Sequence, residues 1–191
     1  MSAKKWGSLY PSRLPLKLFI FKFIATGLVT AALLYPFFNP EGRAGVLTAL
    51  ASIGWLSALI LVAAFFIGVV LYCRALHRCL SLIPSACRTA RPKSVWLMLV
   101  LPYNFIEDFF IINNIVRSLR NAARAYPDLG LHKHLGAVSG FGWCGAQIVS
   151  LSPNLLGTLA SLVGLVLWVI HWRSIARVNR LLSPHDSNAH V

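Results

Sequence analysis

The stretch at residues 94–116 reads SVWLMLVLPYNFIEDFFIINNIV, and its path through the chain decides the fold. It is long enough to cross a bilayer core, which takes about 20 apolar residues. Its centre, however, carries the turn signal PYN at 102–104 and then two acids, Glu107 and Asp108. The segment is therefore either one kinked helix or two half-length helices that enter and leave on the same side. Non-helical backbone at this depth is tolerated only where it is buried in protein or lines a wet cavity.

The composition of the chain predicts a single integral membrane domain, residues 1–191. Hydrophobic residues make up 57% of the chain and charged residues 12%, about half the charged share of a typical soluble domain. The net charge of +13 could suggest nucleic-acid binding. The positive residues, however, flank the apolar segments, where they orient membrane proteins and attract anionic lipid. We therefore expect a bilayer with anionic headgroups as the partner, and no nucleic acid.

Other apolar stretches predict spanning helices on both sides of the central segment. Short turns join them into two hairpins, one before and one after that segment. The predicted spans are about 18–38, 44–73, 136–151 and 155–172. We expect basic cytoplasmic loops at 74–93 and 117–135, and a disordered tail at 183–191.

The distribution of positive charge favours the fold-back of residues 94–116. If this segment returns to the side it entered, every Lys and Arg except Arg43 lies on one side of the membrane. If it spans, the positive residues divide almost evenly, against the positive-inside rule. We therefore predict an all-α, polytopic helical protein with four spanning helices in two hairpins and a re-entrant or kinked central segment. It would lie in a bacterial inner membrane with both termini cytoplasmic, although interfacial amphipathic helices could hold the same charges without re-entry.

The two hairpins end in similar sequence. Arginines four residues apart follow the apolar run in each, at Arg74 and Arg78 and at Arg173 and Arg177. Two hairpins of the same orientation would be parallel repeats. The alternative is that any helix leaving the membrane inward tends to carry such arginines.

Glu107 and Asp108 are the acidic members of a candidate polar site. Ionisable groups at membrane depth are expensive and often functional, so these acids could bind a cation, relay a proton or anchor a basic partner. The alternative is a structural ion pair with nearby arginines. The candidate polar site is Asn104, Glu107, Asp108, Asn113 and Asn114. On a helix, Asn104, Glu107, Asp108 and Asn114 would share a broad face. The candidate ion-pair partners are Arg74, Arg78, Arg117 and Arg120.

Neither a metal nor a cofactor is expected. The four cysteines contain no C-x-x-C pair, and the histidines lie at helix ends or in loops, away from the central positions that a haem requires. Tryptophans such as Trp143 and Trp168 are interpreted as an interfacial belt. Small residues at intervals of four predict close helix packing. They are Gly136, Gly140 and Cys144, and then Ala160 and Gly164.

Three blocks of sequence resemble a known group of proteins. They are RPKSVW at 91–96 with LPYNF at 101–105, IVRSL at 115–119, and WVIHW at 168–172. The chain resembles a loose group of small bacterial four-helix inner-membrane proteins that carry a P-x-x-V-W…P-x-x-N-F block. Glu107 and Asp108 depart from the apolar residues expected there. The group has no activity to transfer, so the resemblance implies only the fold.

We expect a non-enzymatic role, as an accessory or interaction subunit that docks on a larger membrane protein. A second hypothesis is a small transporter or channel that uses Glu107 and Asp108. A third is an immunity protein against a membrane-active toxin.

Overall fold

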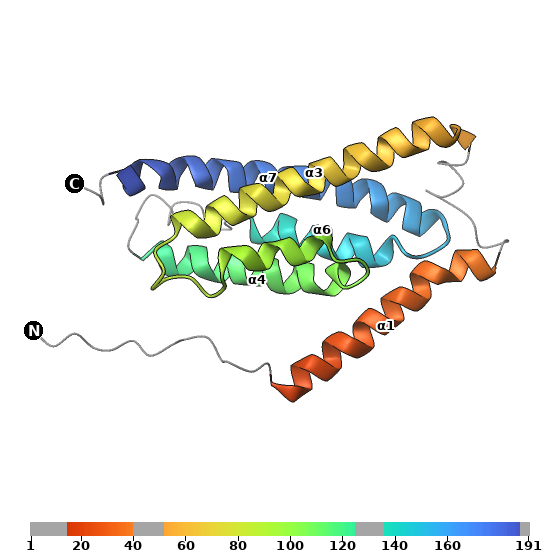
Figure 1. Cartoon of the computed structure of the whole chain (residues 1–191), viewed down its shortest axis with the longest axis horizontal. Helices are drawn as coiled ribbons and strands as arrows, with labels where there is room; N and C mark the ends of the chain where they lie inside the picture. Colours follow the sequence, from red (N-terminus) through yellow and green to blue (C-terminus); the bar gives the residue numbers. More distant parts are fainter. Residues whose placement is uncertain (1–14, 40–51, 125–135, 188–191) are drawn as a thin grey trace, which may run out of the picture.

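The computed structural model describes residues 15–39, 52–124 and 136–187 (Figure 1). Helices are the regular elements among these residues, and no strand occurs among them. The helical elements are α1 (Leu16–Phe38), α3 (Trp55–Leu82), η2 (Pro92–Leu99), α4 (Asn104–Ala122), α6 (Ala137–Val149) and α7 (Leu155–Ser187). All are α-helices except η2, which is a 3-10 helix.

Three of these helices are long and apolar enough to cross a membrane. The candidate spans are Leu16–Pro36, Trp55–Leu82 and Leu155–Ser183. Their outer faces are apolar and uncovered: Phe23 is 74% exposed, Trp55 80% and Leu155 73%. Contiguous apolar surface of this extent is characteristic of helices that contact lipid or another protein. The helices are compatible with a membrane protein.

The fourth predicted span, at 136–151, corresponds to α6. This helix has 13 residues, which makes it about 20 Å long at 1.5 Å per residue. A bilayer core is about 30 Å thick, so α6 alone is too short to cross it. Residues 150–154 form turns and bends before α7 begins at Leu155.

Helices α3 and α7 both continue beyond the apolar runs that predicted them. Helix α3 extends to Leu82, into the segment predicted as the loop 74–93, and buries Leu76 and Leu80 there. Helix α7 extends to Ser187, so residues 183–187 are helical and were wrongly assigned to a disordered tail. Beyond the apolar runs, apolar side chains three or four residues apart face the core, in α3 at Leu76 and Leu80 and in α7 as far as Leu182, while arginines face outward.

The central segment consists of two elements that run in opposite directions. Element η2 ends at Leu99, the Leu101–Pro102 peptide bond is cis, and α4 begins at Asn104. In Figure 1, η2 runs from the end of the molecule near the C-terminus toward the middle, and α4 returns to that end. The segment is therefore not a single kinked helix.

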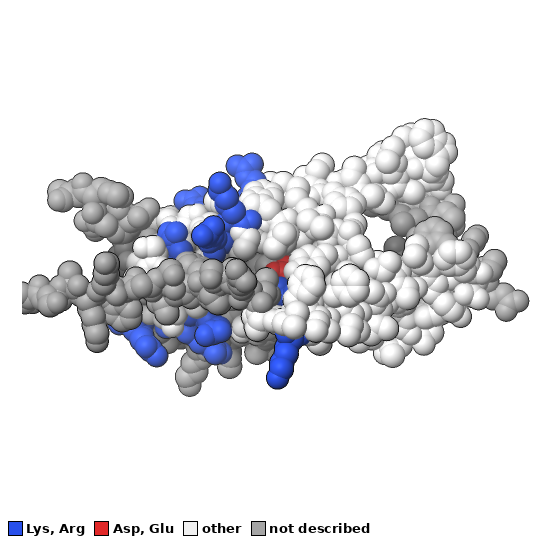
Figure 2. Space-filling view, turned by 60° about the horizontal axis from the view of Figure 1, so that its bottom comes forward, with Lys and Arg blue, Asp and Glu red and all other residues white. Residues whose placement is uncertain are grey.

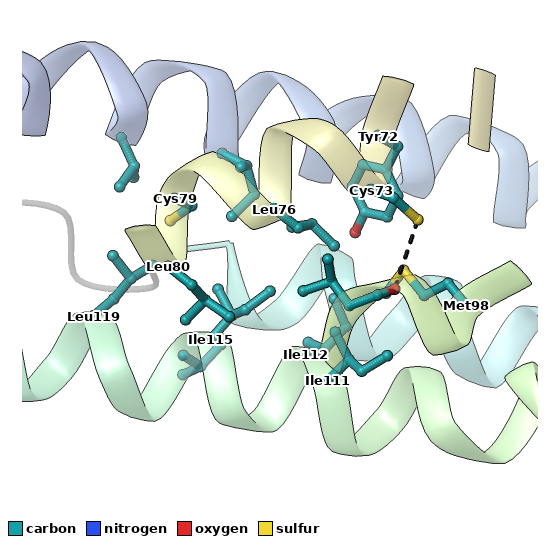
Figure 3. Close-up of a cluster of buried hydrophobic side chains, with 14 of the residues drawn as sticks. Tyr72, Cys73, Leu76, Cys79, Leu80, Met98, Ile111, Ile112, Ile115 and Leu119 are labelled. Carbon is teal, nitrogen blue, oxygen red and sulfur yellow. Dashed lines mark hydrogen bonds between the residues drawn. The ribbon is translucent and has the colours of Figure 1, made fainter. Parts of the chain in front are cut away.

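The core lies where α3, η2, α4, α6 and α7 meet. Helix α4 contributes a stripe of buried residues at helical spacing, including Ile112, Ile115 and Leu119. Figure 3 shows Leu76 and Leu80 extending from α3 toward this stripe of α4. Helix α1 stands apart from this core and packs chiefly against α4.

Positive charge gathers over one half of the molecule. Figure 2 shows the Lys and Arg side chains of the described residues toward the end where α3 and α7 terminate, while the opposite half of this face carries none. Helices α3 and α7 run in the same direction in Figure 1. Their ends are joined by a hydrogen bond of 2.9 Å from Asn179 Nδ2 to the carbonyl oxygen of Ala75.

Candidate functional site

The first turns of α4 place two neighbouring acids on different sides of one helix. Successive residues of an α-helix are rotated by about 100°, so Glu107 faces α1 while Asp108 faces α6. Both are buried: Glu107 is 8% exposed and Asp108 1%. The two carboxylates therefore have separate surroundings and are described separately.

Glu107 forms a salt bridge with Lys22 of α1. The Lys22 ammonium also donates to the Tyr103 hydroxyl at 3.3 Å and lies 4.2 Å from the centroid of the Phe110 ring. Lys22 is 8% exposed, so both charges are removed from solvent and compensated by each other. This arrangement is a structural ion pair that docks α1 on α4.

Glu107 pairs with Lys22 and not with the predicted arginine partners, Arg74, Arg78, Arg117 and Arg120. Among the described residues, none of these arginines forms a salt bridge with Glu107 or Asp108. Arg117 and Arg120 lie on the exposed face of α4, and Arg74 and Arg78 are exposed near the end of α3. Lys22 was missed because it was counted as a flanking positive charge, although the run LFIFKFIATG places it within apolar sequence.

Asp108 faces α6 and shares a short chain of hydrogen bonds with Gln147 and Trp143. With the Gln147 amide oriented so that both of its atoms are paired, its nitrogen donates to Asp108 Oδ2 at 3.3 Å. Its oxygen then accepts from the Trp143 indole N–H at 3.0 Å. Asp108 Oδ1 has no hydrogen-bond partner among the described residues. A buried acceptor in this state is costly unless something else binds it.

Asp108 lines a cavity of about 330 Å³, which we call the Asp108 cavity. It lies between α3, α6 and α7, at the point where the chain folds back from η2 to α4. Its wall is largely aromatic, with Phe65, Phe66, Tyr72, Phe105, Trp143 and Trp168. Its polar lining is Asn104, Asp108, Gln147, Ser150 and Ser161.

Several buried polar atoms in this wall have no partner in the described part of the chain. Besides Asp108 Oδ1, they are Asn104 Oδ1, the Tyr72 hydroxyl and Trp168 Nε1. Most buried polar groups in proteins are hydrogen-bonded, so four such atoms on residues that line one cavity call for an explanation. These four residues together carry two unpaired oxygen acceptors and two unpaired donors.

The other predicted polar residues do not reach the Asp108 cavity. Asn113 and Asn114 are half-buried and do not line it. The Asn114 carbonyl oxygen instead accepts from Thr89 Oγ1 at 2.8 Å and from Ser118 Oγ at 2.7 Å. The bond from Thr89 docks α4 on the segment that precedes η2, which is a structural role.

The predicted small residues lie at close helix contacts. A Cβ atom on Gly140 would approach Ile112 Cγ2 to 2.8 Å and His171 Cε1 to 2.9 Å. One on Gly164 would lie 3.2 Å from Ala146 Cβ. Gly136 has φ +75°, and its carbonyl oxygen lies 2.8 Å from His171 Nδ1. Cys144 is buried and Ala160 half-buried.

Sequence reasoning missed most of the cavity wall. Trp143 and Trp168 were assigned to an interfacial belt, but both are buried and both line the cavity. The spacing of Trp143 and Gln147, four residues apart on α6, was the available signal that the two share a face. Among the described residues, no group of three or more His, Cys, Asp or Glu residues could hold a metal ion.

Comparison of the chain with protein-family models, curated proteins and solved structures finds no match. The function is therefore argued from the geometry of the site.

Proposed function

We propose that this is a multi-pass membrane protein that binds a small lipophilic organic cation in the Asp108 cavity and carries it through the membrane. The observation that carries this proposal is the buried, unpartnered Oδ1 of Asp108 in an aromatic wall. Pockets for small molecules are typically apolar, about 300–1,000 Å³ in volume and provided with a few placed polar groups. The Asp108 cavity meets this description.

The chemistry of the wall favours an ammonium group as the ligand. A carboxylate oxygen and the faces of aromatic rings both attract positive charge, and aromatic cages are the usual receptors of quaternary ammonium groups. A bare Mg²⁺ or Ca²⁺ would require about six or more oxygen ligands. The cavity wall combines one carboxylate with six aromatic rings, which suits an organic cation better than a metal ion.

The position of the cavity mouth supports a lipophilic ligand. Several lining side chains are exposed on the apolar outer surface, among them Phe65, Leu101 and Leu165. In a membrane this surface contacts lipid tails, so a ligand would reach Asp108 sideways from the bilayer. The apolar substituents of such a cation are compatible with entry from the bilayer, and its positive charge complements the Asp108 carboxylate.

The proposal places the membrane so that the basic end of the molecule is cytoplasmic, in a bacterial inner membrane with both termini inside. The gathering of Lys and Arg at the ends of α3 and α7 supports this orientation. Asp108 then lies about 18 Å along α4 from Arg120, near mid-membrane, on a re-entrant η2–α4 hairpin. Residues 155–171 of α7 rise about 24 Å, less than the thickness of the bilayer core of about 30 Å. With the membrane placed in this way, the turn at 150–154 supplies the remaining depth of the α6–α7 hairpin.

The accessory-subunit and immunity hypotheses stay open, but no specific contact favours them. The exposed apolar faces of α1, α3 and α7 would be covered equally well by lipid or by a larger membrane protein. The cavity with its unpartnered polar atoms distinguishes the carrier hypothesis from these two.

Ligand binding can be tested through the tryptophans of the cavity wall. Protein purified in mild detergent would be titrated with benzyltrimethylammonium while indole fluorescence is followed, since Trp143 and Trp168 line the cavity. We expect saturable binding, and a loss of affinity of about tenfold or more in Asp108→Asn because a charge-assisted contact is removed. Uptake of the same cation into proteoliposomes should fall in parallel.

Two controls separate this mechanism from general effects of charge. The double variant Lys22→Met, Glu107→Gln removes an acid one position away that faces α1 without leaving a buried charge unpaired, and it should leave binding largely intact. Neopentylbenzene, the uncharged isostere of the probe, should bind weakly to both proteins. Equal binding of the cation by wild type and Asp108→Asn, or equal binding of the two isosteres by wild type, would contradict the proposal.

A further inference from the structure

A second hollow lies at the basic end of the molecule, away from the Asp108 cavity. It has a volume of about 700 Å³ and is formed by the terminal turns of α3 and α7 together with Trp96 of η2. We call it the arginine groove. Its polar lining residues are Arg74, His77, Arg78, Asn179, Arg180 and Ser183.

The groove is held in shape by contacts between two parallel helices. Asn179 of α7 is buried and donates from Nδ2 to the Ala75 carbonyl oxygen of α3 at 2.9 Å. Nearby, Arg78 Nη2 donates to Ser183 Oγ at 3.2 Å. These bonds fix the register of α3 against α7, so Arg74 and Arg78 line one wall and Arg180 lines the other.

The positive charge in this groove is not neutralised by any side chain that the structure describes. The lining contains three guanidinium groups and no acidic residue. None of the three forms a salt bridge in the described ranges, and Arg74 has no hydrogen bond there either. Each guanidinium has five N–H donors, so most donors remain available. Like charges held in one hollow repel one another, and an anion that bridges them removes that cost.

The groove lies at the border between apolar and charged surface. Toward the membrane, α3 and α7 expose apolar side chains such as Ile67 and Ile170, whereas the turns that line the groove expose arginines. Trp96 completes the wall, and tryptophan is enriched where apolar tails meet headgroups. Basic pockets between helices at this level are suited to anionic headgroups.

We infer that the arginine groove binds a phosphate group through Arg74, Arg78 and Arg180. Arginine matches phosphate oxygens with two parallel N–H bonds, and three arginines on two walls can surround one phosphate. The same chemistry is supplied by the headgroup of an anionic lipid or by a free phosphate compound from the cytosol. The inference does not depend on the carrier function, because it concerns a different site.

The test uses the full-length protein, first delipidated in detergent. Native mass spectrometry then measures which added compound binds to it. Phosphatidylglycerol is added in one arm, phosphatidylcholine in a second and inorganic phosphate in a third. We expect a stoichiometric phosphatidylglycerol adduct. The triple variant Arg74→Gln, Arg78→Gln, Arg180→Gln should reduce adduct formation about tenfold or more, since several charge-assisted bonds are lost.

The matched control is Arg117→Gln, Arg120→Gln, Arg124→Gln, which removes the same charge from exposed positions in the last turns of α4 and just after it. It should retain the adduct. The single variant Arg74→Gln provides a milder test, because Arg74 makes no described hydrogen bond that the fold would lose. An adduct with phosphatidylglycerol alone assigns the groove to a lipid headgroup, and one with both phosphatidylglycerol and inorganic phosphate assigns it to phosphate itself. No adduct in either arm, or equal loss in the two triple variants, would overturn the inference.

Discussion

Lys22 of α1 and Glu107 of α4 are 85 positions apart in the chain and form a buried ion pair. Because α1 packs chiefly against α4, this pair is the main polar link between the first helix and the rest of the molecule. Tyr103 and Phe110, which also contact the Lys22 ammonium, lie next to and on α4, so these contacts hold α1 to the same helix.

Removing one member of this pair should loosen α1. Lys22→Met leaves the Glu107 carboxylate buried and unpaired, which costs about 3–5 kcal/mol in comparable pairs. We expect a lower midpoint of thermal unfolding in detergent and faster proteolysis between α1 and α3. The double variant Lys22→Met, Glu107→Gln should recover most of the loss, because no charge is left unpaired. A single variant as stable as wild type would show that the pair is dispensable.

The unpartnered Tyr72 hydroxyl in the wall of the Asp108 cavity can be tested by its effect on stability. It is buried, lines the cavity and has no described partner, so Tyr72→Phe removes an unsatisfied polar group. We expect unchanged or slightly higher thermal stability, by up to about 1–3 kcal/mol. Marked destabilisation, measured by chemical or thermal unfolding, would mean that the hydroxyl is already bonded in the folded protein.

Gly140 tests how tightly α6 packs against α4 and α7. Gly140→Ala would place a Cβ 2.8 Å from Ile112 Cγ2 and 2.9 Å from His171 Cε1, so the helices must move apart. We expect a loss of about 1–3 kcal/mol from overpacking. Gly145→Ala on the same helix meets no atom within 4 Å and should be neutral or stabilising by about 0.5–1 kcal/mol. Similar effects of the two changes on unfolding would argue against this packing.

The proposed topology makes a clear prediction for thiol labelling of intact cells. A cysteine at Ala123, after α4, should be protected from a reagent that cannot enter the cell, whereas one at Pro153, in the turn before α7, should react. Both should react after the cells are permeabilised. Labelling at Ala123 in intact cells would show that the η2–α4 segment crosses the membrane, and the mid-membrane placement of Asp108 would then need revision.

Much of the fold could be predicted because hydropathy reports burial in lipid directly. The three long helices and the turn at residues 102–104 follow from apolar runs and from Pro-Tyr-Asn. The partner of Glu107 could not be predicted, because its pairing with Lys22 depends on how α1 packs against α4. Trp143 and Trp168 were misplaced for a similar reason: hydropathy identifies apolar residues but not which of them face an internal cavity.

The isolated position of α1 has a consequence for biogenesis. The other five elements share one core, whereas α1 adds a single apolar face and one ion pair to it. Assembly in membranes can proceed by independent insertion of helices followed by lateral association. A polypeptide that begins after residue 40 therefore contains every element of the central core, and α1 supplied as a separate chain could rejoin it within the bilayer.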